Sequence, residues 1–269
     1  SESIIKNNVV SPKQYDSIVP YIDIDIKGRA LYKNRLMMLD LIANNNWKRP
    51  IYFSGGAYDD EDFLWMKNYL QLDGMTYKLV PIKTEIPKDA SPLEMGGIDT
   101  DKMYANVMKW DWGNSESLSI YHDPETRKNS ITYRSYLSRL MNQLILEGKK
   151  EKAKNIITLA MNKMPLEQFG YYSLLEPFAK GYYDLGENAK AQDLLSKLIL
   201  KYKENLKYYS SLTPSDQTSL AIDIITDIER YRSLLLVMKE SGDATFYNKN
   251  KAQFNTYVSI FERFGREKE

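Results

Sequence analysis

The sequence contains no cysteine and only one histidine, His122, in 269 residues. Without cysteine there can be no disulfide, no thiolate nucleophile and no sulfur-ligated metal site. With one imidazole per chain, a zinc site that needs two histidines cannot form in a single copy. The sequence therefore predicts neither a metal nor a cofactor, and we expect His122 in an exposed turn.

An excess of charge and long apolar runs are also missing. Lys plus Arg number 37 and Asp plus Glu number 36, so no long-range field would gather nucleic acid or an anionic membrane surface. The densest apolar run, Leu234–Met238, is far shorter than the roughly 18 residues of a membrane helix. We expect no nucleic-acid partner. The start at Ser1, without methionine, suggests a piece of a longer protein.

The first part of the chain, to about residue 130, mixes extended and helical patterns. The period-two alternation of YIDIDI predicts a half-buried strand over Tyr21–Ile26. Leu31–Ala43 is apolar on most sides, which predicts a mostly buried helix, and the asparagines at 44–46 would end it. Further along, we expect a strand at 50–54, a helix at 59–74 and a strand at 76–82.

The strand and glycine turn in NNNWKRPIYFSGG resemble the layout that holds phosphate groups, in which amide donors and a helix dipole point at the anion. Here the acidic run Asp59–Asp62 occupies the helix entrance after Gly55 and Gly56. Carboxylates would satisfy the free amides from within and repel a phosphate, and neither glycine-rich nucleotide motif is present. We therefore interpret this stretch as a structural corner.

Residues 83–130 are rich in Pro, Gly, Asp and Asn, which predicts an irregular segment with one short helix near Met103–Met108. From Ile131 onward the pattern becomes continuously helical. Small residues and the glycines Gly148 and Gly186 recur at similar positions, which resembles the tetratricopeptide repeat. The two glycines lie 38 residues apart, whereas that repeat has roughly 34.

These patterns predict an α+β fold with two domains. A small mixed α/β domain would span residues 1–130, including the irregular segment 83–130. An all-α array of TPR-like helical hairpins would span residues 131–269, as two degenerate repeats followed by a capping helical pair. The last pair would comprise one long helix from Thr213 to about Glu240 and another from Thr245 to Phe264.

Taken together, LYKNRLMMLDLIANNNWKRPIYFS, YLQLDGMTYKLVPIK and GIDTDKMYANVMKWDWGN resemble one known family. It comprises the carboxy-terminal regions of bacterial multi-pass membrane proteins of unknown function, related to protein O-mannosyltransferases. The resemblance implies an extracytoplasmic domain on the periplasmic face of the cytoplasmic membrane, attached only through upstream spans to a glycosyltransferase-like core. The catalytic acid of that broader class lies in the membrane portion, so no catalytic residue is carried over to this chain.

Two acidic pairs are candidate ligands. Asp99 and Asp101 form an Asp-x-Asp element in GGIDTDKM, a pattern that can hold a divalent metal against a sugar nucleotide. Two acids after two glycines and before an amphipathic segment also suit a helix cap, which is the interpretation we favour. Asp23 and Asp25 are expected on the solvent side of their strand.

Aromatic residues suggest a different kind of site. Trp47, Arg49, Tyr52, Trp110 and Trp112 could form a carbohydrate site, because indole and phenol rings stack on sugar faces while charged groups bind hydroxyls. Aromatic side chains in a mixed domain are also common in cores and at rims. The 21 tyrosines of the chain suit contact with peptides through the helical array, while packing between the hairpins explains many of the same residues.

The sequence therefore predicts a non-catalytic accessory domain that binds protein, peptide or glycan. One alternative is an independent carbohydrate-active enzyme that uses carboxylates, for instance among Asp59, Asp60, Asp99 and Asp101, which would need two acids at a defined separation. Another alternative is a free-standing TPR-like scaffold.

Overall fold

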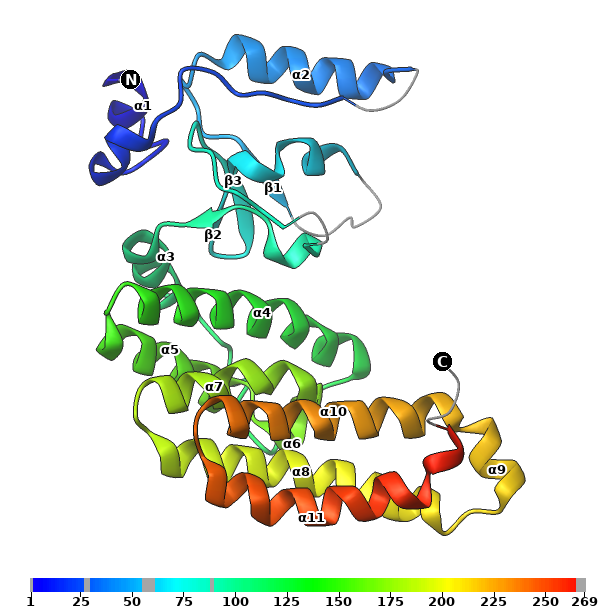
Figure 1. Cartoon of the computed structure of the whole chain (residues 1–269). Coiled ribbons are helices and arrows are strands. Elements are labelled where there is room, and N and C mark those ends of the chain that lie inside the picture. Colours follow the sequence, from blue (N-terminus) through cyan, green and yellow to red (C-terminus); the bar gives the residue numbers. More distant parts are fainter. Residues whose placement is uncertain (1, 27–29, 55–60, 88–89, 265–269) are drawn as a thin grey trace. The chain divides into compact units, whose positions relative to one another are not determined.

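The computed structural model describes residues 2–26, 30–54, 61–87 and 90–264 (Figure 1). The chain divides into two compact units, Ser1–Glu147 (unit 1) and Gly148–Glu269 (unit 2). Unit 1 contains a small four-stranded sheet with helices, and unit 2 is helical. The predicted α+β class is therefore confirmed. The predicted change of domain at residue 131 falls inside a helix of unit 1.

Unit 1 begins with short helices and continues through the sheet to a long helix. In chain order its α-helices and strands are α1 (Glu2–Lys6), α2 (Lys33–Asn45), β1 (Tyr52–Ser54), β2 (Leu70–Asp73), β3 (Thr76–Leu79), β4 (Gly97–Ile98), α3 (Thr100–Val107) and α4 (Pro124–Leu146). Three 3-10 helices lie between them, η1 (Pro12–Ser17), η2 (Glu61–Tyr69) and η3 (Pro92–Glu94). The predicted strands after Pro50 and at 76–82, and the short helix near Met103, are all present.

The sheet has the strand order β1-β3-β2-β4, antiparallel except for the parallel pair β2 and β4. Alternation along the strands separates two faces. Leu70, Leu72, Tyr77 and Leu79 are buried on one face, and the Tyr77 ring meets Tyr136 of α4 edge to face at 5.7 Å. The other face is polar and carries Tyr52, Gln71, Asp73 and Lys78.

Arg139 of α4 anchors the turn before β4. Its guanidinium donates to the carbonyl oxygens of Leu93, Met95 and Gly96 at 2.9, 2.9 and 3.0 Å. At Gly96, φ is +64° and an added Cβ would lie 2.0 Å from the carbonyl oxygen of Leu70, so only glycine fits there. This close approach lets β4 pair with β2.

Three expectations for unit 1 were wrong. Residues 21–26 form no strand within the described part of the chain, although exposure alternates over residues 21–25 as predicted. The helix expected at 59–74 is the 3-10 helix η2 followed by β2, because Gly74, at φ +71°, makes a two-residue hairpin turn with Met75. Helix α2 exists as predicted, but none of its thirteen side chains, all of them described, is buried.

Unit 2 consists of helices that pack side against side. They are α5 (Lys150–Lys163), α6 (Leu166–Phe169), α7 (Glu176–Asp184), α8 (Asn188–Ser210), α9 (Pro214–Ser219), α10 (Ala221–Glu240) and α11 (Ala244–Ile260), with 3-10 turns η4 (Tyr172–Leu175) and η5 (Glu262–Phe264). Helix α8 packs on α7 and α10, and α10 also packs on α11. The array of helical hairpins expected from the sequence is confirmed.

The core of unit 2 follows the apolar periodicity. It includes Phe178, Leu195, Leu198, Tyr202, Ile224, Tyr231, Leu234 and Met238, all buried. The single long helix expected from Thr213 is divided at Leu220 into α9 and α10, whereas Thr213 itself caps α9 as its sequence suggested. Gly186, at φ +77°, makes the turn between α7 and α8. None of the helices in the described ranges is long and apolar enough to cross a membrane.

Candidate binding site

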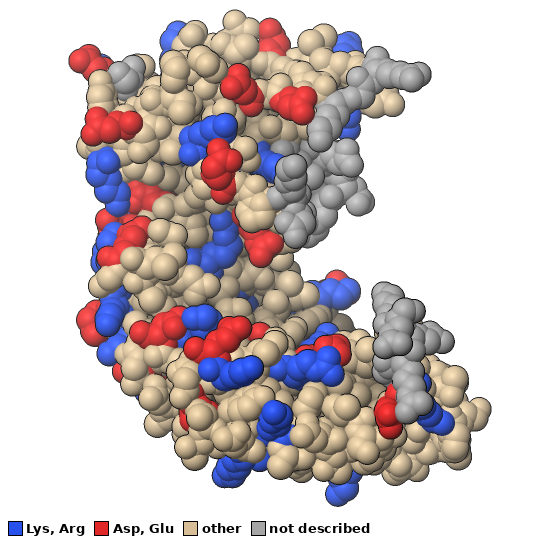
Figure 2. All heavy atoms as spheres, in the orientation of Figure 1, with Lys and Arg blue, Asp and Glu red and all other residues tan. Residues whose placement is uncertain are grey.

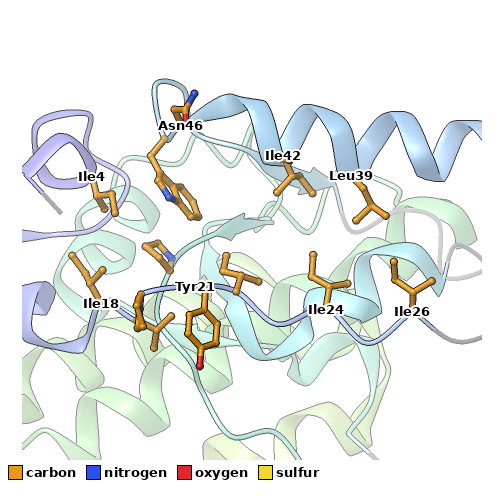
Figure 3. Close-up of a pocket in the computed structure, with 14 residues that line it drawn as sticks. Ile4, Ile18, Tyr21, Ile24, Ile26, Leu39, Ile42 and Asn46 are labelled. Carbon is orange, nitrogen blue, oxygen red and sulfur yellow. The ribbon is translucent and has the colours of Figure 1, made fainter.

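An apolar groove runs between α2 and the segment 18–26 (Figure 3). Its volume is about 810 Å³. Leu39 and Ile42 point from α2 toward Ile24 and Ile26 of the segment. The remaining walls come from Ile4, Ile18, Val19, Pro20, Tyr21, Ile22, Ala43, Asn46, Trp47 and Pro81. The apolar side chains of α2 were predicted to be mostly buried. Instead, Leu39 and Ile42 line an open groove.

Trp47 belongs to the inner end of this groove. Its indole packs against the small core of Ile4, Val9, Val10 and Val80, and its carbonyl accepts a hydrogen bond of 2.9 Å from the Asn7 side chain. The backbone of Trp47 has φ +57°, which follows the left-handed Asn46 that ends α2. The indole of Trp47, which was predicted to bind sugar, therefore serves mostly in packing and closes one end of the groove.

A second hollow, of about 800 Å³, lies along the other side of α2. Arg49 and Tyr52 both line it, together with Met37 and Leu41 of the helix. The Tyr52 hydroxyl donates to Asp73 at 3.1 Å. Burial and the charge of Asp73 raise the pKa of Tyr52 to about 12, so the phenol is neutral at physiological pH. The structure thus brings Arg49 and Tyr52 together but separates them from Trp47.

Trp110 and Trp112 form a three-ring cluster with Tyr133 of α4. The centroids of Trp110 and Trp112 are 5.7 Å apart, and Tyr133 lies 5.5 Å from the first and 5.4 Å from the second. All three side chains are half-buried. Trp112 Nε1 is buried and has no hydrogen-bond partner among the described residues. The indoles therefore pack chiefly against each other, and their use as a sugar platform stays a prediction.

The acidic pair Asp99 and Asp101 is engaged by a lysine. Lys13 Nζ lies 3.1 Å from Asp99 and 2.7 Å from Asp101. Asp99 also caps α3 by accepting from the Lys102 amide at 3.3 Å. Burial would raise the pKa of Asp99, but hydrogen bonds from Ser11, the Lys102 amide and Lys13 outweigh it and hold the pKa below the usual range. The described residues contain no group of three or more metal-ligating side chains.

Lys78 occupies the polar face of the sheet and was not singled out from the sequence. Its side chain is only 1% exposed, and its Nζ donates to the Asn8 carbonyl. Nζ also lies 5.9 Å from the centroid of the Tyr52 ring. Burial, reinforced by the nearby charge of Lys102, lowers the pKa of Lys78 to about 8. This amine links the sheet to the segment after α1 and is closed off from solvent.

Two sequence predictions remain, those for His122 and for the corner at Gly55 and Gly56. His122 is half-buried, with Nε2 at 3.0 Å from the Ser115 carbonyl, instead of fully exposed. The predictions for Gly55, Gly56, Asp59 and Asp60 lie outside the described residues. The groove itself was missed, although its two walls were each visible in the sequence as the YIDIDI alternation and the broad apolar helix. No pattern in the sequence predicted the roles of Lys13 and Lys78.

The charges on the surface do not identify a partner. Lysine and arginine alternate with aspartate and glutamate over the visible face of both units, in keeping with the net charge of +1 (Figure 2). Because no extended patch of one sign is evident on this face, local features such as the groove are the better guide to binding.

Comparison with known proteins gives one match. Residues 1–102 match the family model described as TMEM260-associated domain 2. The matched region includes both walls of the groove, since the segment 18–26 and α2 lie within it. No curated protein and no solved structure matches the chain.

Proposed function

We propose that this chain is a non-catalytic interaction module of a membrane glycosyltransferase-like protein, and that unit 1 binds protein or peptide through the groove beside α2. The observation that carries the proposal is the exposure of α2. Leu39 and Ile42, which line the groove, are only half-buried and belong to a helix of which no residue is buried. Apolar side chains gathered beside a groove are typical of protein-binding surfaces.

The attachment to a glycosyltransferase-like protein rests on the family match. The matched domain takes its name from TMEM260, a family related to O-mannosyltransferases. In this proposal, the parent protein carries the catalytic centre in its membrane portion, and the present chain lies on the periplasmic face. Expression of the parent with a reporter fused after Glu269 tests the location, since a periplasmic reporter should be active and a cytoplasmic one inactive.

A non-catalytic role is supported by the state of the acidic pair. Asp99 and Asp101 share Lys13, and Asp99 also caps α3, and these contacts favour a structural role for the pair. We extend the proposal to unit 2 as a TPR-like array. The turn at Gly186 between α7 and α8 and the packing of α8 on α10 support that similarity.

Selection from a phage-displayed library of random linear peptides tests the binding role. Peptides enriched on the intact chain should lose at least about tenfold in affinity on Leu39→Glu, which places a charge in the groove. Leu36→Glu is the matched control, because Leu36 lies on the same helix and lines neither hollow. Failure to enrich any peptide, or equal losses for the two variants, would contradict the proposal.

A further inference from the structure

The segment after Pro20 runs along α2 (Figure 1). Among the described residues, one of its two backbone edges forms no hydrogen bond. The Val19 amide donates to the Pro81 carbonyl at 2.9 Å, and the Asp23 amide donates to the Tyr69 hydroxyl at 3.2 Å. In an extended chain, the N–H and C=O groups of alternate residues point to the same edge. The edge of Val19 and Asp23 therefore faces the body of unit 1.

The opposite edge belongs to Ile22, Ile24 and Ile26. Within the described part of the chain, the backbone N–H and C=O groups of these three residues form no hydrogen bond. Three isoleucines with free backbone groups on one edge, separated by single residues, make a template to which another strand can add. Isoleucine favours this extended conformation.

The two sides of the segment differ in character. Ile24 and Ile26 point into the groove toward α2, whereas the ring of Tyr21 points to the side away from α2 (Figure 3). Asp23 and Asp25 are exposed, and neither forms an ion pair among the described residues. A strand added beside the isoleucine edge would place alternate side chains under α2 and the remaining ones beside the two carboxylates.

We propose that the free edge of Ile22, Ile24 and Ile26 binds an extended peptide segment of a partner protein in which apolar residues alternate with Lys or Arg. The apolar residues enter the groove beneath Leu39 and Ile42, and the basic residues pair with Asp23 and Asp25. A second copy of this chain is disfavoured as the occupant. Antiparallel pairing of two such segments would set aspartates beside aspartates, and like charges on neighbouring strands repel.

This inference rests on the proposed peptide-binding role and specifies the ligand. The probe is a synthetic peptide of alternating Lys and Ile, measured by fluorescence anisotropy against the intact chain. A peptide of the same composition with its Lys and Ile in separate blocks, and one of alternating Glu and Ile, are the controls. We expect the alternating Lys peptide to bind at least about tenfold more tightly than either control.

Charge reversal sharpens the test. Asp23→Lys combined with Asp25→Lys should lower the affinity for the Lys peptide and raise the affinity for the Glu peptide. The order of the two affinities should therefore invert. Asp111→Lys combined with Glu125→Lys changes the net charge equally at exposed positions outside the groove and should leave the order unchanged. An order that does not invert would overturn the assignment of basic residues to this face.

N-methylated peptides test the backbone pairing. Methylation of the amides at one alternate set of positions should abolish binding, whereas methylation at the other set should be tolerated, because only one peptide edge meets the isoleucine edge. Equal effects of the two sets would contradict strand addition. If library-selected peptides remain sensitive to Leu39→Glu while the alternating peptide fails, strand addition is wrong and the groove still binds peptide. If no peptide binds at all, the proposed function fails too.

Discussion

Helices α2 and α10 have similar apolar runs but opposite surroundings. The run LMMLDLIA of α2 leaves every residue of that helix at least partly exposed, whereas LLLVM of α10 contributes four buried side chains. Helix α10 has α8 on one side and α11 on another, while α2 faces the narrow segment 18–26 across a groove. The comparison teaches that apolar composition predicts a helix, but only a neighbouring element of sufficient surface buries it.

The comparison predicts that the same substitution has unequal costs in the two helices. Leu234 of α10 is 1% exposed, so Leu234→Ala should lower the free energy of unfolding of unit 2 by about 3 kcal/mol through lost burial and a cavity. Leu36→Ala in α2 should change that of unit 1 by less than about 0.5 kcal/mol. Urea unfolding followed by circular dichroism, with hydrogen exchange assigning each transition, measures both. Equal costs would mean that α2 is packed after all.

Besides its apolar core, unit 1 contains a turn that is held by one cation, the guanidinium of Arg139. Arg139→Ala leaves three carbonyl oxygens at the turn before β4 without their donor and should lower the stability of unit 1 by about 2 kcal/mol. Asn129→Ala, at an exposed position of the same helix, should stay within about 0.5 kcal/mol.

Tryptophan fluorescence reports the unfolding of unit 1 alone, so it can measure the effect of Arg139→Ala. All four tryptophans lie in unit 1, at positions 47, 65, 110 and 112. The fluorescence midpoint in urea should therefore fall on Arg139→Ala while the exchange protection of α10 is unchanged. An unaltered midpoint would show that water replaces the hydrogen bonds of Arg139 with no loss of stability.

The buried Lys78 makes the stability of unit 1 depend on pH. Its pKa is about 8 in the folded chain and about 10.5 when unfolded, so between these values the unfolded chain binds more protons. Stability should therefore rise with pH in this window, by about 2 kcal/mol between pH 8 and 10, and should level off below about pH 8, where the folded and unfolded chains both hold the proton. Above pH 10, the raised pKa of Tyr52 opposes the rise, because the folded chain then retains the phenol proton.

Lys78→Met removes the titrating amine and should flatten this rise. The fluorescence-detected urea midpoint, measured in steps from pH 7 to pH 10, gives the slope for both proteins. Lys109→Met, at an exposed position of unit 1, is the control and should keep the slope of the unaltered chain. A rise that persists in Lys78→Met would assign it to other groups.

The salt bridges of Lys13 carry the smallest expected effect. Lys13 and Asp101 are both half-exposed, and Asp101→Asn removes their ion pair of 2.7 Å, so the cost to unit 1 should be below about 1 kcal/mol and should shrink in high salt. Asp99→Asn retains a capping oxygen but removes the charge of a buried carboxylate that also accepts from Lys13, so it should cost more than Asp101→Asn. Urea midpoints in low and high salt measure both variants. A large loss that salt does not reduce would indicate a different role for the pair.

The sequence was informative where local chemistry decides the structure. The asparagine stop of α2, the proline entry to β1, the glycine turn at Gly186 and the helical hairpins of unit 2 all follow from residue type and periodicity. It failed where partners far along the chain decide. The alternation of YIDIDI requires a neighbouring strand to become a sheet element, and none is present in the described part of unit 1.

The predicted site residues divide in the same way. Arg49 and Tyr52 meet in one hollow, and Trp110 meets Trp112, because each pair is close in sequence. Contacts such as Lys13 with Asp101 and Lys78 with Asn8 join residues about 70 or more positions apart, which no local pattern reveals. The groove was likewise hidden because its two walls are separate elements of the chain.

The aspartates of the YIDIDI segment also bear on solubility. An unpaired strand of isoleucines is the kind of segment from which cross-β fibrils grow, and single charges between apolar residues restrain that growth. Asp23→Asn combined with Asp25→Asn would remove the restraint at almost unchanged size. The concentrated protein should then bind thioflavin T and sediment. The two carboxylates proposed to select a basic peptide would therefore also prevent the peptide-free protein from aggregating.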